Sequence, residues 1–314
     1  MKLSINTSPL AKRVIFVLLV FGIFTFLKPE FATYASILSI VQGIVFVGLS
    51  STFLTLLITA GEFDISIGAT TALSAIVGGM LATHLHVNMF LCFCASISVG
   101  VVVGLINAIV VLYGNVPSFI ATIAMLFIAR SLADFISQSE PILNFPQPWH
   151  GFKDSFIGHY FSIFILAILV IFAEILLNHT NFGKVAASIG SNKEAARIAG
   201  INVNRVKMIL FVLTGVGAAL SGYVANIYFS SSRTSLGSGW ELLAIAGLVI
   251  GGNSLFGGRG TVLGLVLGIL LMQIVATGMV ISNINQWWQT VITGVVVLIS
   301  LGVDKKRKKV FTHG

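Results

Sequence analysis

Charge is scarce in this chain. Asp, Glu, Lys and Arg make up 9% of its 314 residues, whereas a soluble domain carries about 25%. No polar stretch is longer than about 30 residues, which excludes a large aqueous domain. Hydrophobic residues make up 56% of the chain, and the mean hydropathy is +1.01. These values predict an all-α, polytopic membrane protein in which residues 1–314 form a single transmembrane domain.

Cysteine and clustered metal-binding side chains are also scarce. The two cysteines, Cys92 and Cys94, lie two residues apart and point away from each other on a helix, so no disulfide is expected. His84 and His86 have weak spacing for a metal site, and solvation at the membrane interface explains them better. No nucleophile accompanies a base in a catalytic motif. We therefore expect no catalytic residues, no metal ion and a protein that is not an enzyme.

A nucleotide site is missing as well. Gly252 and Gly257 have the four-residue gap of a phosphate-binding loop. However, Gly-Arg follows where that motif requires Lys and then Ser or Thr, and the stretch lies between two apolar runs rather than between a strand and a helix. We therefore expect the chain to bind no cofactor of its own.

Apolar runs occupy most of the sequence. A membrane-spanning helix needs roughly 20 apolar residues, and ten runs approach or exceed that length. The eighth run is short and is followed by Gly251-Gly252, which predicts a broken helix. The ten predicted spans are 12–29, 37–59, 66–83, 88–112, 117–137, 160–178, 207–229, 240–251, 261–281 and 287–303.

The 18 basic residues are distributed unevenly about these spans. With both termini in the cytoplasm, 14 of them lie inside, 3 lie outside and Arg130 lies within a span. This bias predicts that orientation, and it explains the net charge of +8 without nucleic-acid binding. Trp240, Trp287 and Trp288 are then expected at the outer ends of their spans, as interfacial anchors. The alternative for the first run is a cleaved signal peptide whose basic region includes Arg13.

Two glycine-containing segments have a similar pattern. Residues 57–70 join the second and third predicted spans, and residues 248–261 join the eighth and ninth. Both run from apolar residues through Gly and polar residues to Gly, Thr and a second apolar run. The pattern is explained either by two parallel repeats with a transport pathway between them, or by two unrelated glycine-rich turns.

The segment Gly61–Gly68 carries two acidic residues, Glu62 and Asp64, between apolar runs and with no basic residue nearby in the sequence. A charge at membrane depth costs several kcal/mol. The two glycines would allow a helix break, whose free backbone groups must be buried in protein or line a cavity. The segment, including Ser66, is therefore either the inner mouth of a pathway or an ordinary hydrated turn.

Few polar residues lie within the spans themselves. Arg130 and Asp134 are four residues apart in the fifth span, so they share a helix face and can pair. Such a pair is either structural or in direct contact with a transported solute. Asn107, in the fourth span, is expected to form a hydrogen bond with another helix.

The most distinctive polar segment is Ser191–Gly200, which lies in the loop 179–207 that the charge bias places in the cytoplasm. Its first residues have the spacing of a capping box, and its last residue is suited to the left-handed position that ends a helix. A helix this short is barely stable alone, so we expect it to dock in a groove of a soluble partner; the alternative is a solvated linker helix. The residues expected to form this docking surface are Ser191, Glu194, Ala195, Ala196 and Gly200.

Three of these segments resemble motifs of one transporter family. Gly61–Gly68 is similar to Gly-Gly-Ile-Asp-Leu-Ser-Val-Gly, although Glu62 and Phe63 replace the usual Gly-Ile. Gly190–Val206 is similar to Gly-x-Asn-x-x-Ala-Ala-x-x-x-Gly-Ile, and Gly251–Gly260 to Gly-Gly-x-Ser-x-x-Gly-Gly-x-Gly. Their order and spacing fit nearly the whole chain. The chain thus resembles the inner-membrane permease subunits of bacterial ATP-binding-cassette importers of the ribose type.

The resemblance implies a complex in the bacterial inner membrane. Two permease subunits, identical or paralogous, would form the pathway, two ATPase subunits would use ATP, and a periplasmic binding protein would deliver a sugar such as ribose or a furanosyl signalling molecule. A branched-chain amino-acid permease is one alternative, and a self-sufficient secondary transporter with intramembrane carboxylates is another. The residues expected along the pathway are Gly61, Glu62, Asp64, Ser66, Gly68, Asn107, Arg130, Asp134 and Asn253.

Overall fold

The structure is a computed structural model that describes residues 9–285, 287–288, 291–292, 294–295 and 298. Within these residues the chain is helical apart from its connections, with one isolated antiparallel bridge between Ile142 and Ser232. The prediction of an all-α fold is therefore confirmed. The elements are α1 (Pro9–Leu27), η1 (Pro29–Ala32), α2 (Tyr34–Thr59), α3 (Ile67–His84), α4 (Met89–Leu112), α5 (Ser118–Ser137), α6 (Gln147–Asp154), α7 (Phe156–Asn178), α8 (Asn181–Ser191), α9 (Lys193–Ile198), α10 (Val203–Phe229), α11 (Trp240–Ile250) and α12 (Val262–Ile281).

Eight of the described helices are long and apolar enough to cross a membrane. The shorter apolar helix α11 occupies the eighth predicted span, and the bounds of the first nine spans agree with the helices to within a few residues. The tenth predicted span, 287–303, lies largely outside the described residues. The chain is a multi-pass membrane protein.

Helix α10 runs through the middle of the bundle and packs against α2, α3 and α4. Glycines make this packing close, because a Cβ on Gly100 of α4 would overlap the carbonyl oxygen of Gly215 in α10. Small hydroxyl side chains bridge α3 to the same helix: the Oγ1 atom of Thr71 donates to the carbonyl oxygen of Ala218 at 3.0 Å. Small residues and interhelical hydrogen bonds are the usual means by which helices associate in a membrane.

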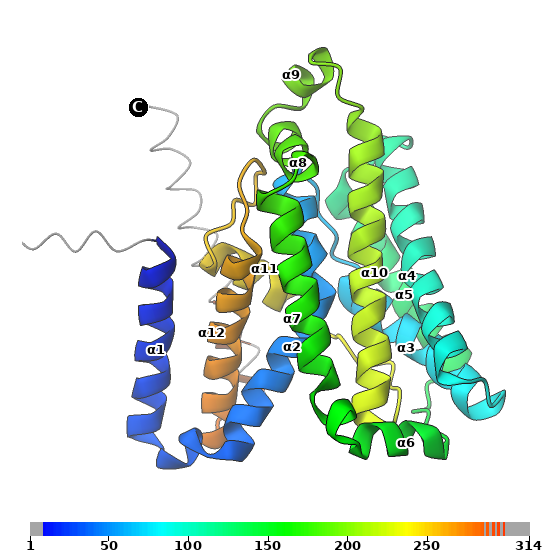
Figure 1. Ribbon diagram of the computed structural model, residues 1–314, viewed down its shortest axis with the longest axis vertical. Coiled ribbons are helices and arrows are strands. Elements are labelled where there is room, and N and C mark those ends of the chain that lie inside the picture. The colour runs from blue at the N-terminus through cyan, green and yellow to red at the C-terminus, as the bar shows by residue number, and fades with distance from the viewer. Residues whose placement is uncertain (1–8, 286, 289–290, 293, 296–297, 299–314) are drawn as a thin grey trace, which may run out of the picture.

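The two ends of the bundle differ (Figure 1). Helix α9 and its flanking loops project beyond the membrane helices at the upper end, α8 lies near the upper end of α7, and α6 lies across the lower end. Trp149, on α6, is 1% exposed, and its ring makes edge contacts with the rings of Phe145 and Tyr223. Basic residues of the loop 179–207 lie at the upper end and Lys153 lies at the lower end, as the charge bias requires.

Helices α3 and α11 begin inside the bundle. An irregular segment, 60–66, runs inward from the upper end of α2 to α3, and a second, 230–239, runs inward from the lower end of α10 to α11 (Figure 1). The two helix starts touch, since a Cβ on Gly68 would overlap the carbonyl oxygen of Gly237. The sequence predicted a broken helix only near Gly251, whereas the segments 60–66 and 230–239 are also non-helical inside the bundle.

The position of α11 corrects one sequence-based prediction. Trp240 was expected at the outer membrane interface, but its ring stacks on Phe46, with centroids 6.2 Å apart. Phe46 lies 12 residues above the lower end of α2, which corresponds to about 18 Å of helix. Trp240 therefore packs in the bundle interior, because the segment before α11 enters the membrane without helical structure.

Candidate functional site

Two backbone amides of the irregular segment 60–66 are satisfied by side chains of the neighbouring helix α5. The amide of Phe63 donates to the Oγ atom of Ser118 at 3.1 Å, and the amide of Ile65 donates to the Oγ1 atom of Thr122 at 3.1 Å. Both acceptors lie in the first turns of α5. Irregular backbone at membrane depth requires such partners. The segment is thus a fixed structural element inside the bundle and not a hydrated turn.

Asp64 is the centre of a buried polar network. Its Oδ1 atom accepts hydrogen bonds from the amide of Ser66 at 2.8 Å and from the Ser66 hydroxyl at 2.6 Å. The Nδ2 group of Asn107, on α4, donates to Asp64 Oδ2 at 3.3 Å and to Ser66 Oγ at 3.0 Å. Asp64 is 3% exposed, so the hydrogen bonds from Ser66 and Asn107 replace those that water would make to its carboxyl group. Three residues selected separately from the sequence therefore form one group.

Glu62 forms an ion pair that the sequence did not predict. The Nζ atom of Lys207 lies 2.5 Å from Glu62 Oε1, and the two side chains are 5% and 14% exposed, respectively. Lys207 is in the second turn of α10, 145 positions from its partner. No basic residue lies near the acidic segment in the sequence, and the fold supplies the cation from a distant helix.

Three glycines from the three motif segments meet at the upper end of the bundle. The Cα atom of Gly190 lies close to Gly61, and a Cβ on Gly257 would lie 2.9 Å from Gly190 Cα and 3.1 Å from Gly61 Cα. The amide of Gly258 donates to the carbonyl oxygen of Thr59 at 2.8 Å. We call this contact of Gly61, Gly190 and Gly257 the glycine junction. Both Gly61 and Gly257 have positive φ, at 80° and 86°, where other residues are strained.

Asn253 holds the third of these segments in shape. Its Nδ2 group donates to the carbonyl oxygen of Leu248 at 3.1 Å, and its Oδ1 atom accepts from the amide of Thr261 at 2.5 Å. The side chain is 1% exposed. Asn253 therefore closes the loop between α11 and α12. Whether it also lines a pathway stays a prediction.

A second polar group lies deeper, where the starts of α3 and α11 meet. Arg130 donates from one guanidinium nitrogen to the carbonyl oxygens of Thr234 and Leu236. Among the described residues, Lys207–Glu62 is the one ion pair, so the expected Arg130–Asp134 pair does not form. The Oε2 atom of Glu241, in the first turn of α11, is buried without a hydrogen-bond partner, and a Cβ on Gly68 would lie 2.7 Å from it.

The projecting segment at the upper end is built differently from the sequence prediction. The loop 179–207 forms two helices, α8 and α9, and Ser191 is the last residue of α8 rather than a helix cap. The cap of α9 is Asn192, whose Oδ1 atom accepts from the amide of Ala195 at 3.0 Å. The capping box of Ser191 with Glu194 is therefore wrong, because α8 continues through Ser191. Gly200 has a φ of 83° and ends the segment as predicted.

The exposed surface of this projection also differs from the expected one. Ala196 is 5% exposed and packs with Ile189 and Val203 in a small core of its own. It is therefore not part of a docking surface. Ala195 is exposed, and Ile198 at the tip is 87% exposed. Docking of a partner at this tip stays a prediction.

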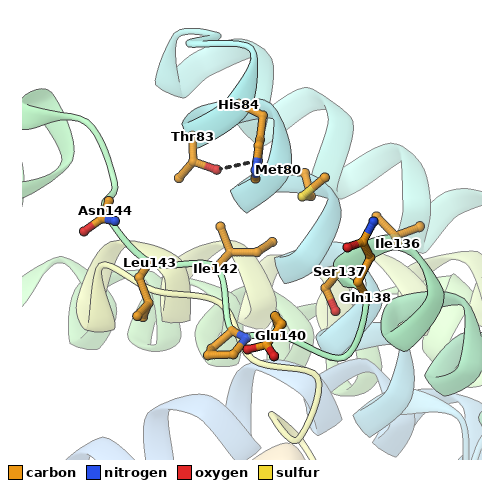
Figure 2. Close-up of a pocket in the computed structure, with 11 residues that line it drawn as sticks. Met80, Thr83, His84, Ile136, Ser137, Gln138, Glu140, Ile142, Leu143 and Asn144 are labelled. Carbon is orange, nitrogen blue, oxygen red and sulfur yellow. Dashed lines mark hydrogen bonds between the residues drawn. The ribbon is translucent and has the colours of Figure 1, made fainter.

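A separate cavity of about 680 Å³ lies at the opposite end of the bundle, between the lower ends of α3 and α5 and the connection that follows α5 (Figure 2). Thr83 and His84, which are hydrogen-bonded at 3.0 Å, lie on one side, and Glu140 and Asn144 lie on the other. None of the residues expected along the pathway or on the docking surface lines this cavity. Within the described part of the chain, no three His, Cys, Asp or Glu residues gather as metal ligands.

The site residues that the sequence analysis missed all contact residues that lie far away in the sequence. Lys207 was counted only as part of the basic bias, Gly190 only as the start of a motif, and Ser118 and Thr122 not at all. A basic residue inside the predicted start of a span was the one usable signal for Lys207, since such a charge needs a partner. Nothing in the sequence singled out Gly237.

Comparisons with known proteins agree with this architecture. Residues 32–301 match the family model described as "Branched-chain amino acid transport system / permease component". The chain is 33% identical over 290 residues to the ribose import permease protein of Bacillus subtilis strain 168, covering 91% of this chain and 89% of that protein. It is 29% identical over 303 residues to the ribose import permease protein of Escherichia coli K12, covering 95% and 94%.

A relative with a different printed solute is also similar. The fructose import permease protein of Bifidobacterium longum NCC 2705 is 33% identical over 278 residues, with 81% of this chain and 80% of that protein covered. No solved structure matches the chain. The family model covers far more than half of the sequence, and the chain therefore belongs to the permease-component family that it describes.

Proposed function

We propose that this chain is the transmembrane permease subunit of an ATP-binding-cassette importer and that it forms the pathway for a monosaccharide. The observation that carries the proposal is the glycine junction, where the three motif segments meet at the end of α8, next to α9 in the chain. A force applied to the projection would reach the segment 60–66 through this contact and through the Glu62–Lys207 pair.

The energy source and the partners belong to the same proposal. ATP would be hydrolysed on separate ATPase subunits that contact the exposed tip at Ile198. A second permease, identical or paralogous, would complete the pathway, and a periplasmic binding protein would deliver the solute. Both termini would then lie in the cytoplasm of a bacterial inner-membrane protein, as the distribution of basic residues supports. The basic tail 305–309 and the N-terminal residues 1–8 lie outside the described residues.

A sugar is the proposed solute because the relatives cited above carry ribose and fructose in their names. The family description favours branched-chain amino acids as the second candidate. Uptake of labelled ribose, fructose, galactose and leucine by cells that express the importer, each measured against excess unlabelled competitors, separates these classes. Uptake of leucine without uptake of any sugar would exclude the sugar proposal.

A secondary transporter would need a carboxylate free to bind a coupling ion. Two of the carboxylates in the bundle have structural partners: Glu62 is paired with Lys207, and Glu174 Oε2 accepts from the amide of Val262 at 2.8 Å at the start of α12. ATP-driven import predicts uptake that continues after a protonophore is added and stops when ATP is depleted. The reverse result would support the secondary transporter.

A further inference from the structure

The crevice between α1 and α12 has the features of a lipid site. It is a cavity of about 270 Å³ with two cationic side chains at one end and apolar side chains along its length. Helix α1 contacts α12 below the crevice, where the ring of Phe24 lies against Gly278. The residues that define it are Lys12, Arg13, Phe16, Val17, Leu267 and Leu271.

The cationic end lies close to the loop of the glycine junction. The guanidinium of Arg13 lies against Gly252, so that a Cβ at this position would overlap it. Gly252 opens the loop that continues through Gly257 to α12. Lys12 is exposed beside Arg13 at the upper end of α1. Two adjacent cations at the end of a membrane helix lie at the depth where phospholipid phosphates are found.

The remaining walls are suited to a hydrocarbon chain. Phe16 is 52% exposed, whereas Val17 and Leu271 are buried at 6% and 7% exposure where the two helices meet. A lipid tail along this groove would cover apolar surface beside α1, and a basic pocket between helices at the membrane surface is the usual site for an anionic headgroup. A soluble anion would use the two cations but not the apolar walls.

We propose that this crevice binds one anionic phospholipid per protomer, with the phosphate held by Lys12 and Arg13 and one acyl chain lying along Phe16 and Leu267. The inference depends on the chain being a membrane protein and not on the identity of its solute. The bound headgroup would lie next to Gly252, so lipid binding would also steady the loop that takes part in the glycine junction.

The test uses the purified permease and native mass spectrometry, with phosphatidylglycerol or phosphatidylcholine added at equal amounts. We expect the wild-type protein to retain one phosphatidylglycerol per protomer and to retain phosphatidylcholine weakly. Removing one cation weakens retention roughly five-fold, and the double variant Lys12→Gln/Arg13→Gln weakens it about 25-fold. Arg13→Lys, which keeps the charge, should retain most of the binding. Lys28→Gln, at the lower end of α1, is the matched control and should have no effect.

A second variant tests the apolar part of the site. Leu267→Trp narrows the groove with both cations in place, and we expect it to reduce lipid retention while leaving the protein monodisperse. Equal retention by the wild type and by Lys12→Gln/Arg13→Gln, or equal retention of the two lipids, would overturn the proposal. Complete displacement of the lipid by glycerol 3-phosphate, together with unchanged binding by Leu267→Trp, would assign the site to a soluble phosphate and overturn it as well.

Discussion

The Glu62–Lys207 ion pair gives the sharpest prediction. Both side chains are largely buried, so removing one partner leaves the other charge without compensation. Breaking a buried pair in this way costs about 3–5 kcal/mol. Because Glu62 keeps 14% of its surface exposed, we expect Glu62→Gln to lie at the lower end, at about 3 kcal/mol. Lys207→Met should have a comparable effect.

The double variant Glu62→Gln/Lys207→Met removes both charges together. We expect it to recover most of the lost stability, because neutral residues of similar volume often replace a buried pair without penalty. With about 3 kcal/mol for each single variant and about 1 kcal/mol left in the double, the coupling energy from the double-mutant cycle should be about 5 kcal/mol. Unfolding in mixed micelles with increasing SDS measures all four proteins. Arg205→Gln, an exposed basic residue on the same helix, is the control for a loss of positive charge.

Transport separates the mechanical role from stability. If the pair links α10 to the segment 60–66, the exchanged variant Glu62→Lys/Lys207→Glu should restore more uptake than either single exchange. Additive effects of the two single substitutions on unfolding, with a coupling energy near zero, would show that the two side chains do not interact and would refute the reasoning.

Three further predictions follow from the same contacts. Gly190→Ala should abolish uptake, because the new Cβ would overlap the carbonyl oxygen of Thr59. The control Gly22→Ala, which has open space around the new Cβ, should leave uptake unchanged. Equal uptake by the two variants would argue against a tight glycine junction. Ile198→Glu should leave the permease stable but prevent copurification of the ATPase, since this side chain is 87% exposed, and retained ATPase would exclude the tip from the contact. Asp64→Asn keeps one oxygen to accept from Ser66 but turns an amide toward the Nδ2 group of Asn107, which donates to the second oxygen in the wild type. We expect this variant to stay in the membrane and to impair uptake, and normal uptake would restrict Asp64 to a structural role.

The same contacts explain an unusual feature of the sequence. The family pattern that this chain resembles has Gly-Ile where Glu62 and Phe63 stand. In the structure the carboxylate of Glu62 meets Lys207, and the amide of Phe63 donates to Ser118. The acidic residue is therefore explained by a partner on α10, and it does not by itself indicate a different solute.

The sequence alone determined the membrane helices and the ends at which charges gather. Hydropathy is a local property, because each residue of a span must be compatible with lipid or with a buried helix face. The predicted spans 88–112 and 117–137 therefore coincide with α4 and α5 to within one residue at each end. The end of the segment at Gly200 could also be predicted from the local sequence, because glycine adopts a positive φ readily.

Only the tertiary structure decided which of these residues meet. Asp64 and Asn107 are 43 positions apart, and Glu62 and Lys207 are 145 apart, so no local pattern records either contact. The failures have the same origin: Ala196 was expected on a docking surface, but Ile189 and Val203 cover it. The periodicity of a helix shows that one face is apolar but not which residues cover that face. Its burial depends on which other segments of the chain pack against it.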